Sequence, residues 1–211
     1  MAGRLRLNDC VWPALAMALG VASFMAWWVM GLAGAERWGW QAAPHPDAGS
    51  VWRWWTAALV HINAAHLQAN LWATVVVAAW GWAARAGTPQ GMAWLLAWPL
   101  AHALLITDPG TLSRYVGLSA TLHAGAAIIC WYLLWHAHGA RRAVGAAVSV
   151  AILIKLGLEM PVDAQALPDA PGHVIAGHAH GCGVLAGLAS AAVVDGIMRA
   201  WQRRVPTPEP P

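Results

Sequence analysis

Long apolar runs alternate with short Gly- and Pro-rich segments along most of the 211-residue chain. The runs cover approximately residues 11–34, 62–84, 90–107, 117–136, 143–158 and 173–199. A helix that crosses a bilayer needs about 20 mainly apolar residues, so the pattern predicts an all-α bundle of six spans. The first run is too long for a signal peptide, and we expect it to remain as an uncleaved span. The fifth run is the shortest and carries Lys155 near its end, where the side chain can reach the membrane surface.

The composition places this pattern in a membrane. Apolar residues make up 59% of the chain and charged residues only 10%, whereas soluble domains carry about 25% charged residues. Sixteen Trp stand against one Phe and two Tyr, and Trp favours the interface between lipid and water. The cysteines Cys10, Cys130 and Cys182 show no metal-ligand or redox spacing, so we expect buried free thiols. Lipid is the expected surrounding, and no cofactor is expected.

The arginines orient the predicted spans. With a cytoplasmic N-terminus, eight arginines fall on the inner side and three on the outer side, while most acidic residues, Glu159 among them, fall outside. The positive-inside rule therefore favours cytoplasmic termini, and the net charge of +3 requires no nucleic-acid partner. We expect a cytoplasmic N-terminus over 1–10, a six-span domain over 11–199, and a disordered cytoplasmic tail over 200–211.

Polar side chains gather at the start of the second, fourth and sixth runs. The three segments are "HINAAHLQAN" (61–70), "YVGLSATLHAG" (115–125) and "HVIAGHAHGCGVLAG" (173–187). These spans would all cross from outside to inside, so their first turns lie in the same leaflet. Strongly polar groups at membrane depth are costly and usually face the bundle interior. The sequence therefore predicts one shared site that opens to water near the outer surface.

Acyl transfer is the chemistry that these residues favour. Ser119 is the candidate nucleophile, at a loop-to-helix junction whose backbone N–H groups are able to stabilise an oxyanion. His180 is the candidate base. His66 and Asn70, four residues apart on one helix face, are candidate donors to developing negative charge.

Small residues predict how the base reaches the nucleophile. Gly183 and Gly187 lie three and seven residues after His180. Glycines at such spacing let two helices approach closely. We therefore expect the sixth span to pack against the fourth, with His180 near Ser119.

The chain resembles the rhomboid family of intramembrane serine proteases. The resemblance rests on three motifs in the family's order: His61-x4-His66-x3-Asn70, Gly117-x-Ser119, and Ala179-His180-x2-Gly183-x3-Gly187. It extends from Val51 through Leu188 and implies the family's six-span form. The segment from Glu36 to Thr56, rich in Trp, is similar to the family's first loop, which lies partly in the membrane interface.

The resemblance also implies roles for individual residues. Ser119 and His180 would form a catalytic dyad without an aspartate. His66, Asn70 and the Ser119 backbone N–H would form the oxyanion hole, and His61 would hold the outer loop. The supporting residues implied by the motifs are His61, Gly117, Leu118, Gly183 and Gly187.

Within the family, the chain is most similar to the bacterial rhombosortase branch. The compact size and "GLSATLHAG", with Leu122 and His123, carry this likeness. Ala120 departs from it, because the family usually has Gly after the serine. The branch implies a bacterial inner-membrane protein whose substrates are transmembrane proteins with a Gly-Gly-containing C-terminal anchor, cut near the periplasmic face.

Two other classes of function remain open at this point. A metal site or transporter would use His61, His66, His178 and His180, since imidazole is a common ligand; no carboxylate joins these histidines inside a span, and Ser119 would have no role. A non-catalytic rhomboid-like protein would bind transmembrane helices without cleaving them; such a protein would have no need of both Ser119 and His180. We expect no metal.

Overall fold

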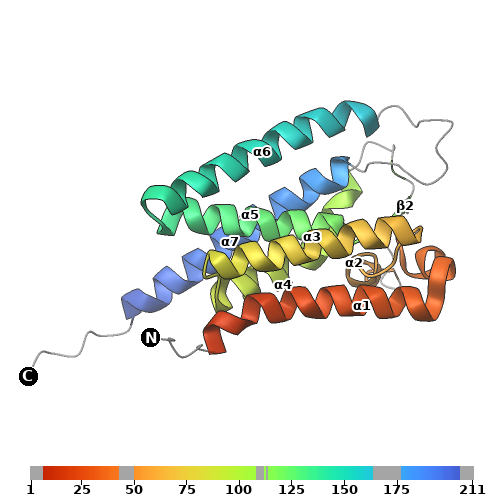
Figure 1. Ribbon diagram of the computed structural model, residues 1–211, viewed down its shortest axis with the longest axis horizontal. Coiled ribbons are helices and arrows are strands. Elements are labelled where there is room, and N and C mark those ends of the chain that lie inside the picture. Colours follow the sequence, from red (N-terminus) through yellow and green to blue (C-terminus); the bar gives the residue numbers. More distant parts are fainter. Residues whose placement is uncertain (1–6, 43–49, 108–111, 113, 164–176, 205–211) are drawn as a thin grey trace, which may run out of the picture.

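The computed structural model describes residues 7–42, 50–107, 112, 114–163 and 177–204. Within these residues the long helices lie side by side in one bundle (Figure 1). The elements in chain order are α1 (Leu7–Trp38), β1 (Trp40–Gln41), α2 (Arg53–Thr56), α3 (Ala64–Ala83), α4 (Thr88–Ala103), η1 (Leu104–Thr107), β2 (Arg114–Tyr115), α5 (Ser119–His136), α6 (Gly139–Asp163) and α7 (Gly177–Arg204). The structure is therefore all-α apart from a ribbon of two short strands.

The six long helices coincide with the six apolar runs, with differences at their ends. α6 has 25 residues and is longer than the predicted run over 143–158. α7 continues to Arg204, so the first five residues of the predicted tail are helical. Residues 1–6, 173–176 and 205–211, on which other predicted boundaries fall, lie outside the described residues.

The outward faces of these helices are apolar. Val76 on α3, Leu153 on α6 and Ile197 on α7 are all more than half exposed. By length and composition, two helices within the described residues are able to cross a membrane, Cys10–Trp38 and Gly177–Arg204. Helices satisfy their backbone hydrogen bonds internally, as a lipid environment demands. The fold is consistent with an integral membrane protein.

Close packing of α5 against α7 forms the centre of the bundle. A β-carbon added at Gly183 would overlap the Ala120 carbonyl group, and one added at Gly187 would overlap that of Ala124. The two helices therefore touch backbone to backbone, which only glycine permits at these positions. This contact fixes the height of the first turn of α7 beside the first turn of α5.

Tryptophan and cysteine occur in the interior as well as on the surface. Trp12 and Trp94 are fully buried and stack with ring centroids 4.3 Å apart. Each indole N–H donates to a backbone carbonyl, that of Val77 and that of Thr121 respectively, as a buried indole requires. All three cysteines are free thiols, but Cys10 is exposed, contrary to the expected burial.

The β1–β2 ribbon anchors the segment that precedes α5. Trp40 pairs with Tyr115 in antiparallel register. Gly117 N donates to the Ala57 carbonyl at 2.9 Å, and the Thr56 hydroxyl donates to the Trp38 carbonyl. The part of the predicted first loop that the structure describes is thus a strand and a short helix tied to the approach to Ser119.

Candidate active site

The N-terminal ends of α3, α5 and α7 meet at one end of the bundle, on the right in Figure 1. Ser119 is the first residue of α5, directly after Leu118. Gly117 has φ +114°, a conformation that L side chains rarely adopt. A β-carbon there would also lie 2.6 Å from His66 Cε1. The glycine therefore turns the chain into α5 and lets α3 approach its backbone.

Ser119 and His180 are in hydrogen-bond contact. Ser119 Oγ lies 3.0 Å from His180 Nε2, across 61 residues of sequence. The His180 side chain is 12% exposed, so bulk water reaches only a small part of the ring. A serine hydroxyl that donates to an imidazole nitrogen is the arrangement of an activated nucleophile with its base.

Tyr115 is a second partner of the serine hydroxyl. Its hydroxyl oxygen lies 2.9 Å from Ser119 Oγ and accepts the Ala120 N–H at 3.0 Å. Burial raises the pKa of Tyr115 above its ordinary value of 10.0, so the group stays protonated at neutral pH. Where the Tyr115 hydroxyl donates to Ser119 Oγ, the serine's own proton is directed to His180.

The far edge of the His180 ring meets a carboxylate. His180 Nδ1 lies 2.8 Å from Glu159 Oε2. The other oxygen of Glu159, Oε1, pairs with Lys155 one turn earlier on α6. The ring face is covered by His123, whose centroid lies 4.2 Å away with the planes 18° apart. His180 is therefore held at both edges and on one face.

His66 and Asn70 approach the turn before Ser119 from α3. The β-carbon position at Gly117 is 2.8 Å from His66 Nε2 and 3.3 Å from Asn70 Nδ2. Asn70 is 5% exposed, and among the described residues Asn70 Nδ2 meets no hydrogen-bond partner. Buried donors are normally satisfied, so this amide is available to a group that enters the site.

The comparison with protein families agrees with this geometry. A model of the Rhomboid domain matches residues 48–195, about 70% of the chain. The chain belongs to the rhomboid family. Rhomboid proteins are integral membrane proteins and are typically intramembrane serine proteases. No curated protein matches the chain significantly.

Most of the residues that the rhomboid resemblance singles out lie together. Ser119, His180, His66 and Asn70 all surround the turn at Gly117. The supporting residues lie behind them: Leu118 and His61 are fully buried, and Gly183 and Gly187 face α5. The His61 ring packs edge-on against the His66 ring, with the ring centroids 5.1 Å apart.

The four histidines of the metal alternative do not converge on one point. His61 contacts His66, His180 contacts Ser119, and His178 Nε2 lies 3.4 Å from Thr107 Oγ1. Across the described ranges, no group of three His, Cys, Asp or Glu side chains is arranged to hold a metal ion. The side-chain geometry therefore does not favour the metal site.

Three residues at this rhomboid site were not predicted from the sequence. The sequence pattern places Tyr115 in the polar segment that opens the fourth run, Lys155 near the membrane surface and Glu159 on the outer side, and it gives none of them a role in the site. The resemblance implied a Ser–His dyad without an aspartate, and the structure places a glutamate at His180 Nδ1. The available signal was the i, i+4 spacing of Lys155 and Glu159 at the outer end of an apolar run.

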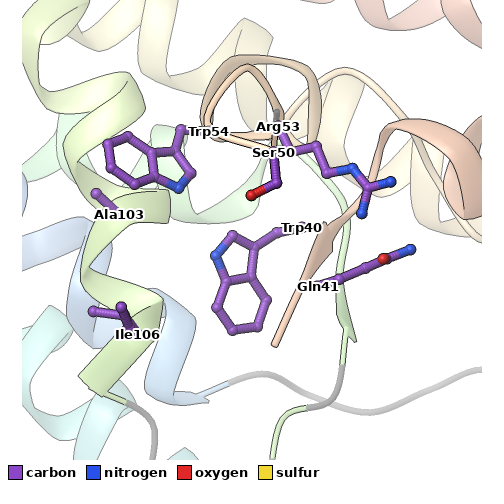
Figure 2. Close-up of a pocket in the computed structure, with 7 residues that line it drawn as sticks. All are labelled: Trp40, Gln41, Ser50, Arg53, Trp54, Ala103 and Ile106. Atoms are coloured by element: carbon purple, nitrogen blue, oxygen red, sulfur yellow. The ribbon is translucent and has the colours of Figure 1, made fainter. Parts of the chain in front are cut away.

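A small cavity lies on the outer side of the ribbon, between β1, α2 and the end of α4 (Figure 2). Its lining includes Trp40, Arg53, Trp54 and Ala103, and its volume is about 30 Å³. That space holds only about two water molecules. It is too small for a substrate side chain.

Proposed function

We propose that this rhomboid protein is an intramembrane serine endopeptidase with Ser119 as nucleophile and His180 as base. The observation that carries the proposal is the 3.0 Å contact between Ser119 Oγ and His180 Nε2 at the N-terminus of α5. A non-catalytic helix-binding protein would have no use for this contact. The Tyr115 hydroxyl lies 2.9 Å from Ser119 Oγ and is able to donate to it, which supports the same orientation of the serine proton.

The reaction follows from these contacts. Ser119 Oγ attacks the scissile carbonyl carbon, its proton passes to His180 Nε2, and the carbonyl electrons move onto the oxygen. When the C–N bond breaks, His180 gives that proton to the departing amine, leaving an acyl-serine. Water then attacks the acyl carbon, with His180 taking its proton and returning it to Ser119 Oγ.

The oxyanion hole of this proposal consists of His66, Asn70 and the Ser119 backbone N–H. The first N–H groups of an α-helix have no intrahelical acceptor, and Ser119 begins α5. The buried amide of Asn70 lies beside the same turn. Donors held in place before the reaction stabilise the charge that appears on the carbonyl oxygen in the transition state.

The proposed topology has six spans, with both termini in the cytoplasm of a bacterium and the active site near the periplasmic face of the inner membrane. It is supported by the six long helices and by the excess of arginine on the inner side. The common end of α3, α5 and α7 in Figure 1 is then the outer end of the bundle. A spanning substrate would reach the site laterally, near its own outer end.

The proposed substrates are exported proteins with a C-terminal anchor that contains Gly-Gly, as in the rhombosortase branch. A helical carbonyl is already hydrogen-bonded, so a substrate must unwind before Ser119 can attack it. Each Gly lowers that cost by about 1 kcal/mol relative to Ala. The stretch from Gly117 to Gly125, with Leu122 and His123, supports this branch. Ala120 differs from it, because the family usually has Gly at that position.

Fluorophosphonate labelling of the purified protein tests the nucleophile. We expect the wild-type protein to be labelled on Ser119, and the Ser119→Ala and His180→Ala proteins to remain unlabelled while keeping their expression and topology. Labelling of Ser119→Ala equal to that of wild type would contradict the proposal. Because the probe carries no peptide, the result does not depend on the substrate.

A reporter protein with a C-terminal Gly-Gly anchor tests the substrate. Co-expression should release the reporter, and mass spectrometry of its new C-terminus should place the cut near the glycines. The matched control replaces both glycines with Leu and should stay anchored. Equal cutting of the Leu version at the same bond would contradict the Gly-Gly specificity and leave the protease activity standing.

A further inference from the structure

The carboxylate of Glu159 lies between two donors. Its Oε2 is 2.8 Å from His180 Nδ1, and its Oε1 pairs with the Lys155 ammonium. The Glu159 and His180 side chains are 16% and 12% exposed. Each oxygen thus has its own partner, and the interaction with His180 is largely shielded from water, where a charge-assisted hydrogen bond is strongest.

These contacts select one tautomer of His180. A carboxylate oxygen only accepts hydrogen bonds, so a distance of 2.8 Å is favourable only if Nδ1 carries a proton. Lys155 Nζ lies 3.3 Å from His180 Nδ1, but an ammonium group and a protonated ring nitrogen are both donors and cannot bond to each other. Lys155 and His180 therefore both donate to the Glu159 carboxylate. With the proton on Nδ1, the lone pair of neutral His180 is on Nε2, facing Ser119 Oγ at 3.0 Å.

We propose that Glu159 is a positioning residue that completes a Ser119–His180–Glu159 triad, with Lys155 holding the carboxylate in place. The inference rests on the proposed function, because it assigns a role to the third group of that same site. Glu159 keeps His180 in the tautomer that accepts the serine proton. It also stabilises the positive charge that the ring gains when that proton arrives.

Other titratable groups near His180 come from every element packed around it. α5 contributes His123 on the ring face, and β2 contributes Tyr115, whose hydroxyl reaches the ring only through Ser119. α7 itself carries His178 and Cys182, and α6 carries Lys155. Glu159 is the only acidic side chain in an ion pair with His180 among the described residues. Removing its charge therefore leaves the protonated ring beside the Lys155 ammonium with no compensating anion.

The test compares Glu159→Gln with Glu159→Asp in the full-length protein. In Glu159→Gln the amide oxygen should pair with Lys155, so the NH₂ group faces His180 Nδ1 and favours the tautomer with the proton on Nε2. We expect the rate of fluorophosphonate labelling at Ser119 to fall by roughly 10²–10⁴-fold. Glu159→Asp keeps the charge and should retain more of the rate than Gln, although Gln is closer to Glu in size.

Two readouts separate this role from simple support of the fold. The acidic limb of the labelling rate against pH should move to lower pH in Glu159→Gln, because the protonated ring has lost its anion. ¹⁵N NMR of histidine-labelled protein, with the His180 signals assigned from His180→Ala, should show the proton on Nδ1 in wild type and on Nε2 in Glu159→Gln. A merely structural glutamate would change neither.

The matched control is Asp195→Asn, which removes the carboxylate of a second His–carboxylate pair, His136–Asp195, and should label at the wild-type rate. If Glu159→Gln labels like wild type with the same pH limb, the triad is wrong and the dyad stands. If wild type is labelled no more than Ser119→Ala, the proposed function itself fails. If Glu159→Gln does not fold, Glu159→Asp is compared with Glu159→Asn, which has the same side-chain size but no charge. The Asp protein should be labelled faster, and a rate below that of Glu159→Asn would overturn the proposal.

Discussion

Two histidine–carboxylate pairs brace this bundle, one at each end of α7. His180 meets Glu159 on α6, and His136 on α5 meets Asp195, both at 2.8 Å. The first pair engages Nδ1 and leaves Nε2 to Ser119. The second engages Nε2 itself, and none of the described contacts brings a nucleophile to that ring.

The environments of the two carboxylates also differ. Asp195 Oδ2 additionally accepts the Trp131 indole N–H at 2.7 Å and lies 3.6 Å from Arg199. The His136 side chain is 34% exposed, against 12% for His180. A histidine–carboxylate pair is thus a partly exposed structural contact at Asp195 and part of the proposed active site at Glu159. The two pairs differ in which ring nitrogen contacts the carboxylate, and in whether the other nitrogen contacts a nucleophile such as Ser119.

The largest expected difference between the two ends concerns the histidines themselves. His180→Ala should lower cleavage to background, by roughly 10⁶-fold as at other serine-protease sites, because His180 is the only imidazole that contacts Ser119 Oγ among the described residues. His136→Ala should keep most of the rate. The double variant Ser119→Ala/His180→Ala should be no slower than either single one, as cleavage assays of all four proteins would measure. Full activity in His180→Ala would remove the distinction between the two ends.

The oxyanion donors should show the next largest effect. Asn70→Ala removes a buried amide beside Gly117 and should reduce turnover by roughly 10²–10³-fold. Thr74→Val, one turn further along α3 and away from the site, removes a hydroxyl that donates to the Asn70 carbonyl and should change turnover only slightly. Kinetics of the two proteins on one substrate provide the measurement. Equal rates for Asn70→Ala and wild type would mean that the hole lies elsewhere.

Substitution of two glycines of α7, one beside the site and one near Asp195, should have opposite effects on stability. Gly183→Ala introduces a β-carbon against the Ala120 carbonyl and should lower the free energy of unfolding by about 1–3 kcal/mol, together with activity. A β-carbon at Gly196, near Asp195, meets nothing within 4 Å, so Gly196→Ala should stabilise the helix by up to about 1 kcal/mol. Thermal unfolding in detergent distinguishes them. A neutral Gly183→Ala would show that the two helices can separate at no cost.

The smallest expected effect is that of Asp195→Asn. It weakens a partly exposed brace and should lower the free energy of unfolding by about 1 kcal/mol or less, with cleavage unchanged. Denaturant unfolding and a cleavage assay on the same preparation measure both quantities. A large loss of activity would contradict the separation of brace and site.

The sequence predicts those parts of this site whose position follows from the depth of a residue in the membrane. The apolar runs set where each helix begins, and His66, Ser119 and His180 fall in the first turns of α3, α5 and α7. The glycines at 183 and 187 then indicate which helix approaches α5. Depth and one close contact are enough to bring these residues together.

Glu159 and Tyr115 depend on information that the pattern does not carry. The i, i+4 spacing of Lys155 and Glu159 indicates a polar face on α6, but it does not tell which neighbouring helix that face meets. Tyr115 is placed by a ribbon of only two residues per strand, too short to leave an alternating pattern. Both are set by tertiary packing.

The His123 ring has a further consequence for how the site works. Its Nδ1–H donates to the carbonyl of Ser119 at 2.7 Å, and its face lies parallel to His180. This stacking restricts rotation of the His180 imidazole about its side-chain bonds. The entropy of fixing that ring is lost once, when the protein folds, and not again in every catalytic cycle. The first turn of α5 thus carries both the nucleophile Ser119 and the His123 ring that covers the base on α7, so a shift of that turn would move both.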